Sequence, residues 1–105
     1  VKPNFITDKI VKSEIIELNK KNMRINLKNK LVLIENADPG YDWIFGYKIK
    51  GLITKHGGVN SHMAIRCQEL NIPAVIGVGE NNYHLISKSN KISLDCKNSR
   101  INIPN

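Results

Sequence analysis

The sequence predicts an α/β fold in which short strands alternate with short helices. A continuous apolar run at 31–35, bounded by polar residues, is typical of a buried strand. In the segment 51–79 an apolar run, a glycine pair and a stretch with helical spacing follow one another, which predicts strand, turn and helix in that order. Near the C-terminus, apolar residues alternate with polar ones at 92–94 and 101–103, as expected for two further strands.

The length and composition indicate one globular domain. We expect residues 1–105 to form a single domain with a modest core, and because the chain begins with Val1 we expect it to be a fragment of a longer multidomain protein. No apolar run of about 18 residues and no signal-peptide pattern is present, so we expect a cytoplasmic protein without a membrane partner. Cys67 and Cys96 lack a metal-like spacing and are expected to be reduced thiols.

The net charge of +7 raises the question of a nucleic-acid partner, because a basic balance can provide contacts to phosphates. The lysines, however, are scattered along the chain, and no run of them exceeds two residues. Only 6% of residues are aromatic, so side chains for base stacking are scarce. We therefore expect no nucleic acid as a partner.

The first third of the chain predicts strands joined by turns. Residues 1–8 are interpreted as the end of a linker from a preceding domain. The stretch 10–18 is predicted as a strand, although a helix from Ser13 remains an alternative. As a strand it would carry apolar residues on both faces, with Ile10, Ile16 and Leu18 on one and Val11 and Ile15 on the other. A second short strand is expected at 23–27, followed by a turn at 28–30.

Two helices are expected around the middle of the chain, and a shorter one later. Asp38 as N-cap and Pro39 at the first helical position are strong start signals for the first helix. Its apolar face is expected to contain Trp43, Ile44 and Tyr47. The second helix is expected to end at Pro73, before a strand at 74–78. Residues 80–86 are expected to form one or two helical turns.

His62 is the residue that calls for a chemical explanation. It follows the pair Gly57-Gly58 and stands at the predicted start of the second helix, where Asn60 or Ser61 can serve as the N-cap. The first turn carries no Asp or Glu, although acids are favoured there. The partial positive charge of this helix end is therefore left for an external anion.

The surroundings of His62 favour phosphate chemistry. Glycines just before a helix let a phosphate approach backbone that a Cβ would block. A neutral imidazole in that position can attack a phosphoryl donor and carry the phosphate as a phosphoramidate. The plainer alternatives are a surface or capping histidine and a glycine turn without a ligand. We favour phosphohistidine for His62, and we interpret His56 and His84 as ordinary surface residues.

The motif around His62 resembles a known family. The pattern T-x-x-G-G-x-x-S-H-x-A-I at 54–65, continued by E-L-x-I-P-A-V-x-G at 69–77, is similar to the mobile phosphohistidine domain of PEP-utilising enzymes. These enzymes include PEP synthase, pyruvate phosphate dikinase, the first enzyme of the sugar phosphotransferase system and rifampicin phosphotransferases. The resemblance implies a three-layer β/β/α swivelling domain in which His62 is phosphorylated.

The resemblance also implies that several domains take part in the reaction. The chain would be the phosphotransfer domain of a PEP synthase-like or pyruvate phosphate dikinase-like enzyme, relaying a phosphoryl group between a nucleotide-binding domain and a pyruvate/PEP domain. The sequence has no nucleotide-binding glycine loop with its lysine and no acidic cluster for a metal. ATP, Mg²⁺ and PEP or pyruvate must then come from partner domains, in cis or in trans, and the chain is not expected to be active alone. The alternatives are a rifampicin-phosphotransferase-type fragment and a non-catalytic docking relic.

Four residues besides His62 are expected to contact the phosphate: Gly57, Gly58, Ser61 and Arg66. Ser61 can act as N-cap, as a donor through its hydroxyl, or as both. Arg66 lies one helical turn after His62 and either pairs with the phosphate or is solvated.

Three positions depart from the family pattern. Asn60 stands where many members have Thr, which in the dikinases is a regulatory phosphorylation site, and Met63 and Gln68 replace the usual Ala and Arg. The family's regulation therefore does not transfer to this chain.

Overall fold

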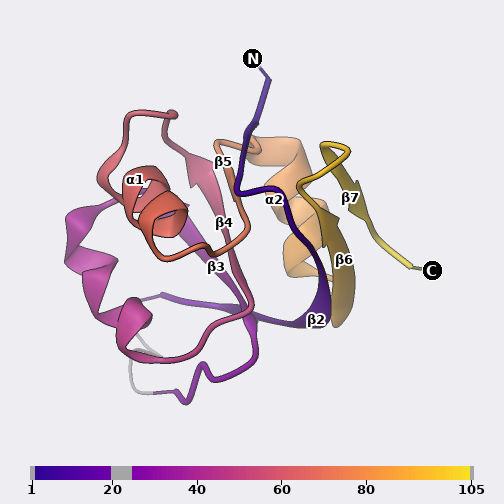
Figure 1. Cartoon of the computed structure of the whole chain (residues 1–105). Coiled ribbons are helices and arrows are strands. Elements are labelled where there is room, and N and C mark those ends of the chain that lie inside the picture. Colours follow the sequence, from indigo (N-terminus) through magenta and orange to yellow (C-terminus); the bar gives the residue numbers. More distant parts are fainter. Residues whose placement is uncertain (1, 20–24, 105) are drawn as a thin grey trace.

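A computed structural model describes residues 2–19 and 25–104 of the chain. The described residues form an α/β structure in which one mixed sheet has helices on both faces (Figure 1). The elements are β1 (Asn4–Ile6), β2 (Ile10–Glu17), β3 (Leu31–Asn36), the 3-10 helix η1 (Pro39–Gly46), β4 (Gly51–His56), α1 (His62–Glu69), β5 (Ala74–Ile76), α2 (Glu80–Ser87), β6 (Lys91–Asp95) and β7 (Arg100–Asn102). The predicted α/β class is confirmed.

The order of strands in the sheet is β1-β5-β4-β3-β2-β6-β7. The four central strands β5, β4, β3 and β2 run parallel, whereas β1, β6 and β7 pair antiparallel with their neighbours. The connections from β3 to β4 and from β4 to β5 contain η1 and α1, and both move along the sheet in the same direction. Right-handed crossovers in one direction place their helices on one face. Figure 1 shows η1 and α1 together on that face and α2 on the other.

Strands β3, β4 and β5 carry buried side chains on both faces, since successive side chains of a strand point to opposite sides. In β3, Val32 and Ile34 face η1 and α1, whereas Leu31 and Leu33 belong to a second cluster with α2 and β6. All four side chains are fully buried. The apolar run at 31–35 therefore forms the buried strand that was predicted.

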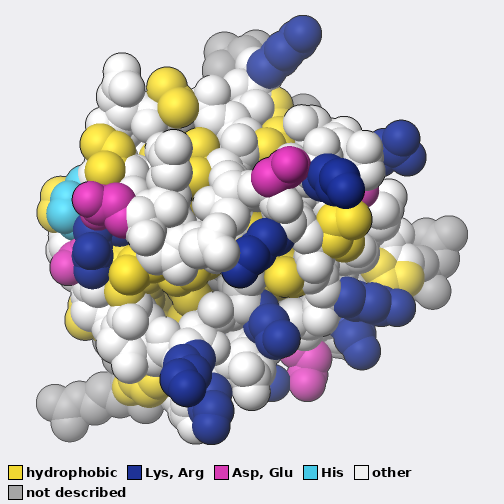
Figure 2. All heavy atoms as spheres, in the orientation of Figure 1, with side chains coloured by type: hydrophobic (Ala, Val, Ile, Leu, Met, Phe, Trp, Pro, Cys, Tyr) yellow, Lys and Arg dark blue, Asp and Glu magenta, His cyan; other side chains and the backbone are white. Residues whose placement is uncertain are grey.

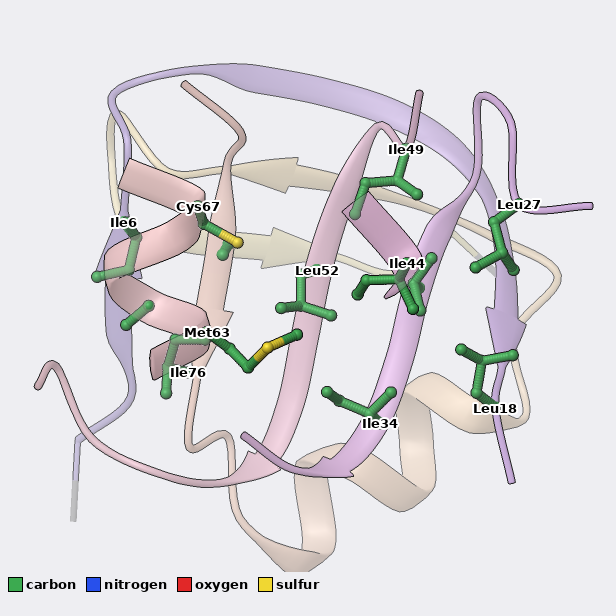
Figure 3. Packing of buried hydrophobic residues seen from close by; sticks show 13 residues of the cluster. Ile6, Leu18, Leu27, Ile34, Ile44, Ile49, Leu52, Met63, Cys67 and Ile76 are labelled. Atoms are coloured by element: carbon green, nitrogen blue, oxygen red, sulfur yellow. The ribbon is translucent and has the colours of Figure 1, made fainter. Parts of the chain in front are cut away.

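Helix α1 is held to the sheet by the apolar side chains of one face. Figure 3 shows Met63 and Cys67 pointing from α1 toward Leu52 of β4 and Ile76 of β5. Both cysteines are buried free thiols, as expected, and burial raises the pKa of the Cys67 thiol to about 12. Residues 2–19 and 25–104 include no helix that is long and apolar enough to cross a bilayer.

The interpretation of residues 1–8 as a linker is wrong. Strand β1 lies within this segment, pairs antiparallel with β5 and buries Ile6. A strand of three residues is too short for a period of two to be recognised in the sequence. The strand expected at 23–27 lies partly outside the described residues, and 25–27 form no strand, although Leu27 is buried.

The strand predicted at 10–18 is confirmed as β2, and the helical alternative is wrong. Ile16 and Leu18 belong to the core on one face, and Val11 and Ile15 pack against the core on the other. Ile10, expected beside Ile16 and Leu18, is 56% exposed.

Both central helices begin where the sequence predicts. Asp38 caps η1, since its Oδ1 accepts a hydrogen bond from the Gly40 N–H at 2.8 Å, but η1 is a 3-10 helix. Ile44 is buried and Trp43 packs against the core, while Tyr47, expected on the same face, is exposed. Helix α1 ends at Glu69 and not at Pro73, because Asn71 takes a left-handed conformation with φ of +60°.

The core under α1 generates a first prediction. Met63→Ala removes most of a fully buried side chain between α1 and the sheet, so we expect it to lower the free energy of unfolding by about 2–5 kcal/mol. Leu85→Ala is the control, because Leu85 is 56% exposed and its loss should change that energy by about 0.5 kcal/mol or less. Urea unfolding of the two variants measures the difference, and equal losses would contradict the packing in Figure 3.

Candidate functional site

His62 is the first residue of α1, and Ser61 is its N-cap. The Ser61 hydroxyl oxygen accepts a hydrogen bond from the Ala64 N–H at 3.3 Å, and the Ser61 carbonyl accepts one from the Ile65 N–H at 3.1 Å. Between the two candidates for the cap, Ser61 is therefore correct and Asn60 is not. The His62 side chain remains 42% exposed, whereas the next side chain, Met63, is fully buried. The helix thus presents the imidazole to solvent at its positive end.

The loop before α1 depends on Gly57. Its φ is +130°, and a Cβ at this position would lie 2.8 Å from the Ala37 Cβ. Its carbonyl oxygen would lie only 2.6 Å from a Cβ at Gly77, which has φ of +79°. The backbones of the two glycines therefore approach more closely than side chains would allow. Gly57 is a structural requirement of the loop.

Thr54 fixes the same loop from the end of β4. Its side chain is fully buried, donates to the His56 carbonyl at 2.9 Å and accepts from the Gly77 N–H at 3.0 Å. A buried hydroxyl with both partners in place favours one conformation of the chain. No role was predicted for Thr54 from the sequence. Its signals were its place as the first residue of the motif at 54–65 and its polarity within an apolar run.

Gly58 differs from Gly57. A Cβ built at Gly58 would have no neighbour within 4 Å, and its φ is not in the left-handed region. Its carbonyl oxygen accepts from the Ser61 N–H at 3.0 Å, which closes the turn into α1. Fold packing does not require a glycine here, and the space around its Cβ position, at the start of the turn into α1, is open.

Asp42 connects His62 to Arg66, and this contact was missed in the sequence. Asp42 lies on η1, and its Oδ1 is 2.9 Å from His62 Nε2 and 3.3 Å from Arg66 Nε. The guanidinium also lies 3.8 Å from Glu69 Oε1 and stacks 5.4 Å from the centre of the Phe45 ring. Asp42 lies in the first turn of η1, and no pattern in the sequence indicates its two contacts with α1.

The electrostatics of this cluster keep Asp42 ionised. Its hydrogen bond to His62, followed by that to Arg66, lowers the pKa of the carboxyl below its ordinary value. All three side chains are partly exposed, between 33% and 48%. Figure 2 shows histidine, acidic and basic side chains gathered at the edge of the molecule over η1 and α1.

The described residues offer no ready metal site. Within 2–19 and 25–104, no three His, Cys, Asp or Glu side chains are grouped so that they could hold an ion. The one carboxylate beside His62 already contacts Arg66, and a neighbouring cation opposes the binding of another. The residues around His62 therefore do not fit Mg²⁺.

The comparison with protein families agrees with the motif. The family model described as "PEP-utilising enzyme, mobile domain" matches residues 26–99, which include β3, η1, β4, α1 and the loop of Gly57. The chain belongs to this family.

A curated relative and a solved structure are also similar. Rifampicin phosphotransferase from Bacillus cereus is 40% identical over 68 residues, which make up 64% of this chain and 8% of the relative. The chain thus spans a small part of that protein's length. The solution NMR structure of a UPF0107 protein superposes with a TM-score of 0.71 at 9% identity, over 100% of this mobile-domain chain and 98% of the other. That likeness shows the fold alone.

The contrast between the two glycines generates a second prediction. Gly57→Ala should lower the free energy of unfolding by about 1–3 kcal/mol, because the new Cβ meets Ala37 and φ is unfavourable. Gly58→Ala is the matched control and should change that energy by about 0.5 kcal/mol or less. Thermal unfolding of both variants is the measurement, and a larger loss from Gly58→Ala than from Gly57→Ala would contradict the loop geometry.

Proposed function

We propose that this chain is a phosphohistidine carrier domain. In this proposal His62 takes a phosphoryl group at a nucleotide-binding domain and gives it up at a pyruvate/PEP domain, within a PEP synthase-like or pyruvate phosphate dikinase-like enzyme. The observation that carries the proposal is the half-exposed His62 imidazole at the N-terminus of α1 in a chain of the mobile-domain family.

The chemistry requires few groups from this chain. A lone pair of the His62 imidazole forms the N–P bond, while the P–O bond of the donor breaks and its electron pair stays on the leaving oxygen. The helix end supplies partial positive charge, the space at Gly58 admits phosphoryl oxygens, and Arg66 is a full cation one turn away. We assign Gly57 to the shape of the loop and Ser61 to both the cap and a hydroxyl facing the phosphate.

The rest of the reaction is assigned to other domains. ATP, Mg²⁺ and PEP or pyruvate would be bound by flanking domains or separate subunits, and the metal would neutralise phosphate charge there. We propose that the chain swivels between them as the β/β/α domain of a longer polypeptide. It is a phosphotransferase part and does not turn over alone.

A second candidate follows from the curated relative. The similarity to rifampicin phosphotransferase supports a domain whose final acceptor is a drug hydroxyl instead of pyruvate. Phosphate transfer from the labelled domain to rifampicin or to pyruvate, tested with the full-length protein, distinguishes the two. A non-catalytic relic is disfavoured, because His62 is present and Gly58 stands where packing does not require a glycine.

The carrier role generates a third prediction. His62→Ala should abolish phosphate uptake while the free energy of unfolding stays within about 1 kcal/mol, because the side chain is half-exposed. We would incubate the chain with a lysate of its source cells and with separately labelled ATP and PEP. His84→Ala, which alters an exposed histidine on α2, should take up label normally.

Label that is acid-labile, alkali-stable and lost only in His62→Ala would support the carrier. Equal labelling of the folded His62→Ala variant would overturn it.

A fourth prediction concerns the space before α1. Gly58→Val fills a position where a Cβ has no neighbour within 4 Å, so it should reduce the rate of labelling about tenfold or more while changing stability little. The rate of labelling and the midpoint of thermal unfolding are measured on one preparation. Labelling at the normal rate would mean that phosphate does not approach over Gly58.

A further inference from the structure

The contact of Asp42 with both His62 and Arg66 has no counterpart in the sequence motif. One oxygen, Asp42 Oδ1, lies within hydrogen-bond distance of His62 Nε2 at 2.9 Å and of Arg66 Nε at 3.3 Å. Two donors that converge on one carboxylate oxygen define a position for an anion. In the unphosphorylated chain, the chain's own carboxylate fills that position.

Arg66 has other contacts that hold it in place. Its guanidinium stacks on the Phe45 ring at 5.4 Å and lies 3.8 Å from Glu69 Oε1, one helical turn away. Asp42, in contrast, is 48% exposed and caps no helix, since Asp38 performs that role for η1. The guanidinium can therefore stay where it is when the Asp42 side chain turns away.

We propose that Asp42 occupies, in the unphosphorylated domain, the anion position that the phosphoryl group takes on His62 Nε2. Transfer then exchanges one anion for another: the carboxylate leaves, and the Arg66 guanidinium passes from the carboxylate to the phosphoryl oxygens. This inference rests on the proposed carrier function and adds to it a positioning residue, Asp42.

Proton balance makes the exchange necessary for attack by Nε2. An ionised carboxylate at 2.9 Å from Nε2 means that this nitrogen carries the proton, so its lone pair is not available. When Asp42 turns away, Nε2 can lose its proton to water while Nδ1 takes one, which the exposure of the ring permits. The Nε2 lone pair then forms the N–P bond, and the donor's P–O bond breaks toward the leaving oxygen.

Asp42 and a phosphoryl group on Nε2 cannot share the position. Both are anions, and like charges at contact distance repel each other. Arg66 Nε lies 3.3 Å from the same carboxylate oxygen that is 2.9 Å from Nε2, so a phosphoryl group on that nitrogen comes within reach of the cation that Asp42 has left. The contact covers the nucleophile until an incoming anion displaces the carboxylate.

The exchange is tested on the ¹⁵N-arginine-labelled chain by NMR, before and after phosphorylation with phosphoramidate, a small phosphoryl donor. The Nε–H signal of Arg66, identified by its loss in Arg66→Lys, reports the guanidinium's partner. We expect wild type and Asp42→Ala to differ before phosphorylation and to coincide after it. Phosphorus–proton correlations should place the phosphoryl group on Nε2 of His62.

A comparison of carboxylates provides the matched control. Asp42→Asn removes the competing anion and should raise the level of phosphohistidine about two- to fivefold at fixed phosphoramidate, as expected for loss of an exposed ion-pair contact. Glu69→Gln removes the other carboxylate at Arg66 without touching His62, and should change that level by less than about twofold.

The outcomes separate the two proposals. A phosphorylated His62 whose Arg66 signal still depends on Asp42, a phosphoryl group on Nδ1, or a lower phosphohistidine level in Asp42→Asn would overturn the exchange and leave the carrier function standing. A folded chain in which His62 takes up no phosphate from phosphoramidate or from lysate donors would overturn the carrier function and the exchange with it.

Discussion

The arrangement of the candidate site depends on the burial of both faces of the parallel strands β3, β4 and β5. Neighbouring parallel strands must be joined by crossovers, and the two crossovers here run along the sheet in the same direction. Each has to cover apolar side chains of the same face, so η1 and α1 lie side by side. Asp42 and His62, 20 residues apart, meet because of this geometry.

The loops that follow β4 and β5 combine a rigid part and an open part. Thr54, Gly57 and Gly77 form the rigid part, with a buried hydroxyl bonded twice and two glycine backbones in close approach. Gly58 and His62 form the open part, where added atoms meet no neighbour and the imidazole faces water. In the proposed carrier, the nucleophile enters the active sites of other domains and needs both properties: a fixed position and free access.

Much of this arrangement could be predicted from the sequence wherever the pattern lies within a few neighbouring residues. The buried run of β3, a helix cap at Asn60 or Ser61 and the start of α1 at His62 all follow from patterns within a few residues. The contact between Asp42 and His62 could not be predicted in this way, because sequence periodicity does not relate residues on two different elements. The different roles of Gly57 and Gly58 also required coordinates, since they depend on φ and on Ala37, a neighbour from another loop.

A phosphoryl carrier has to stabilise the phosphoryl group enough to keep it and little enough to release it. The anion position between His62 and Arg66 is partly exposed, and ion pairs in such positions are screened by water and salt. In the proposed exchange, the carboxylate and then the phosphoryl group each make a partly exposed ion pair with Arg66, so this contact stabilises neither state strongly. A deeply buried arginine would bind the phosphoryl group more tightly and would oppose its release to the next acceptor.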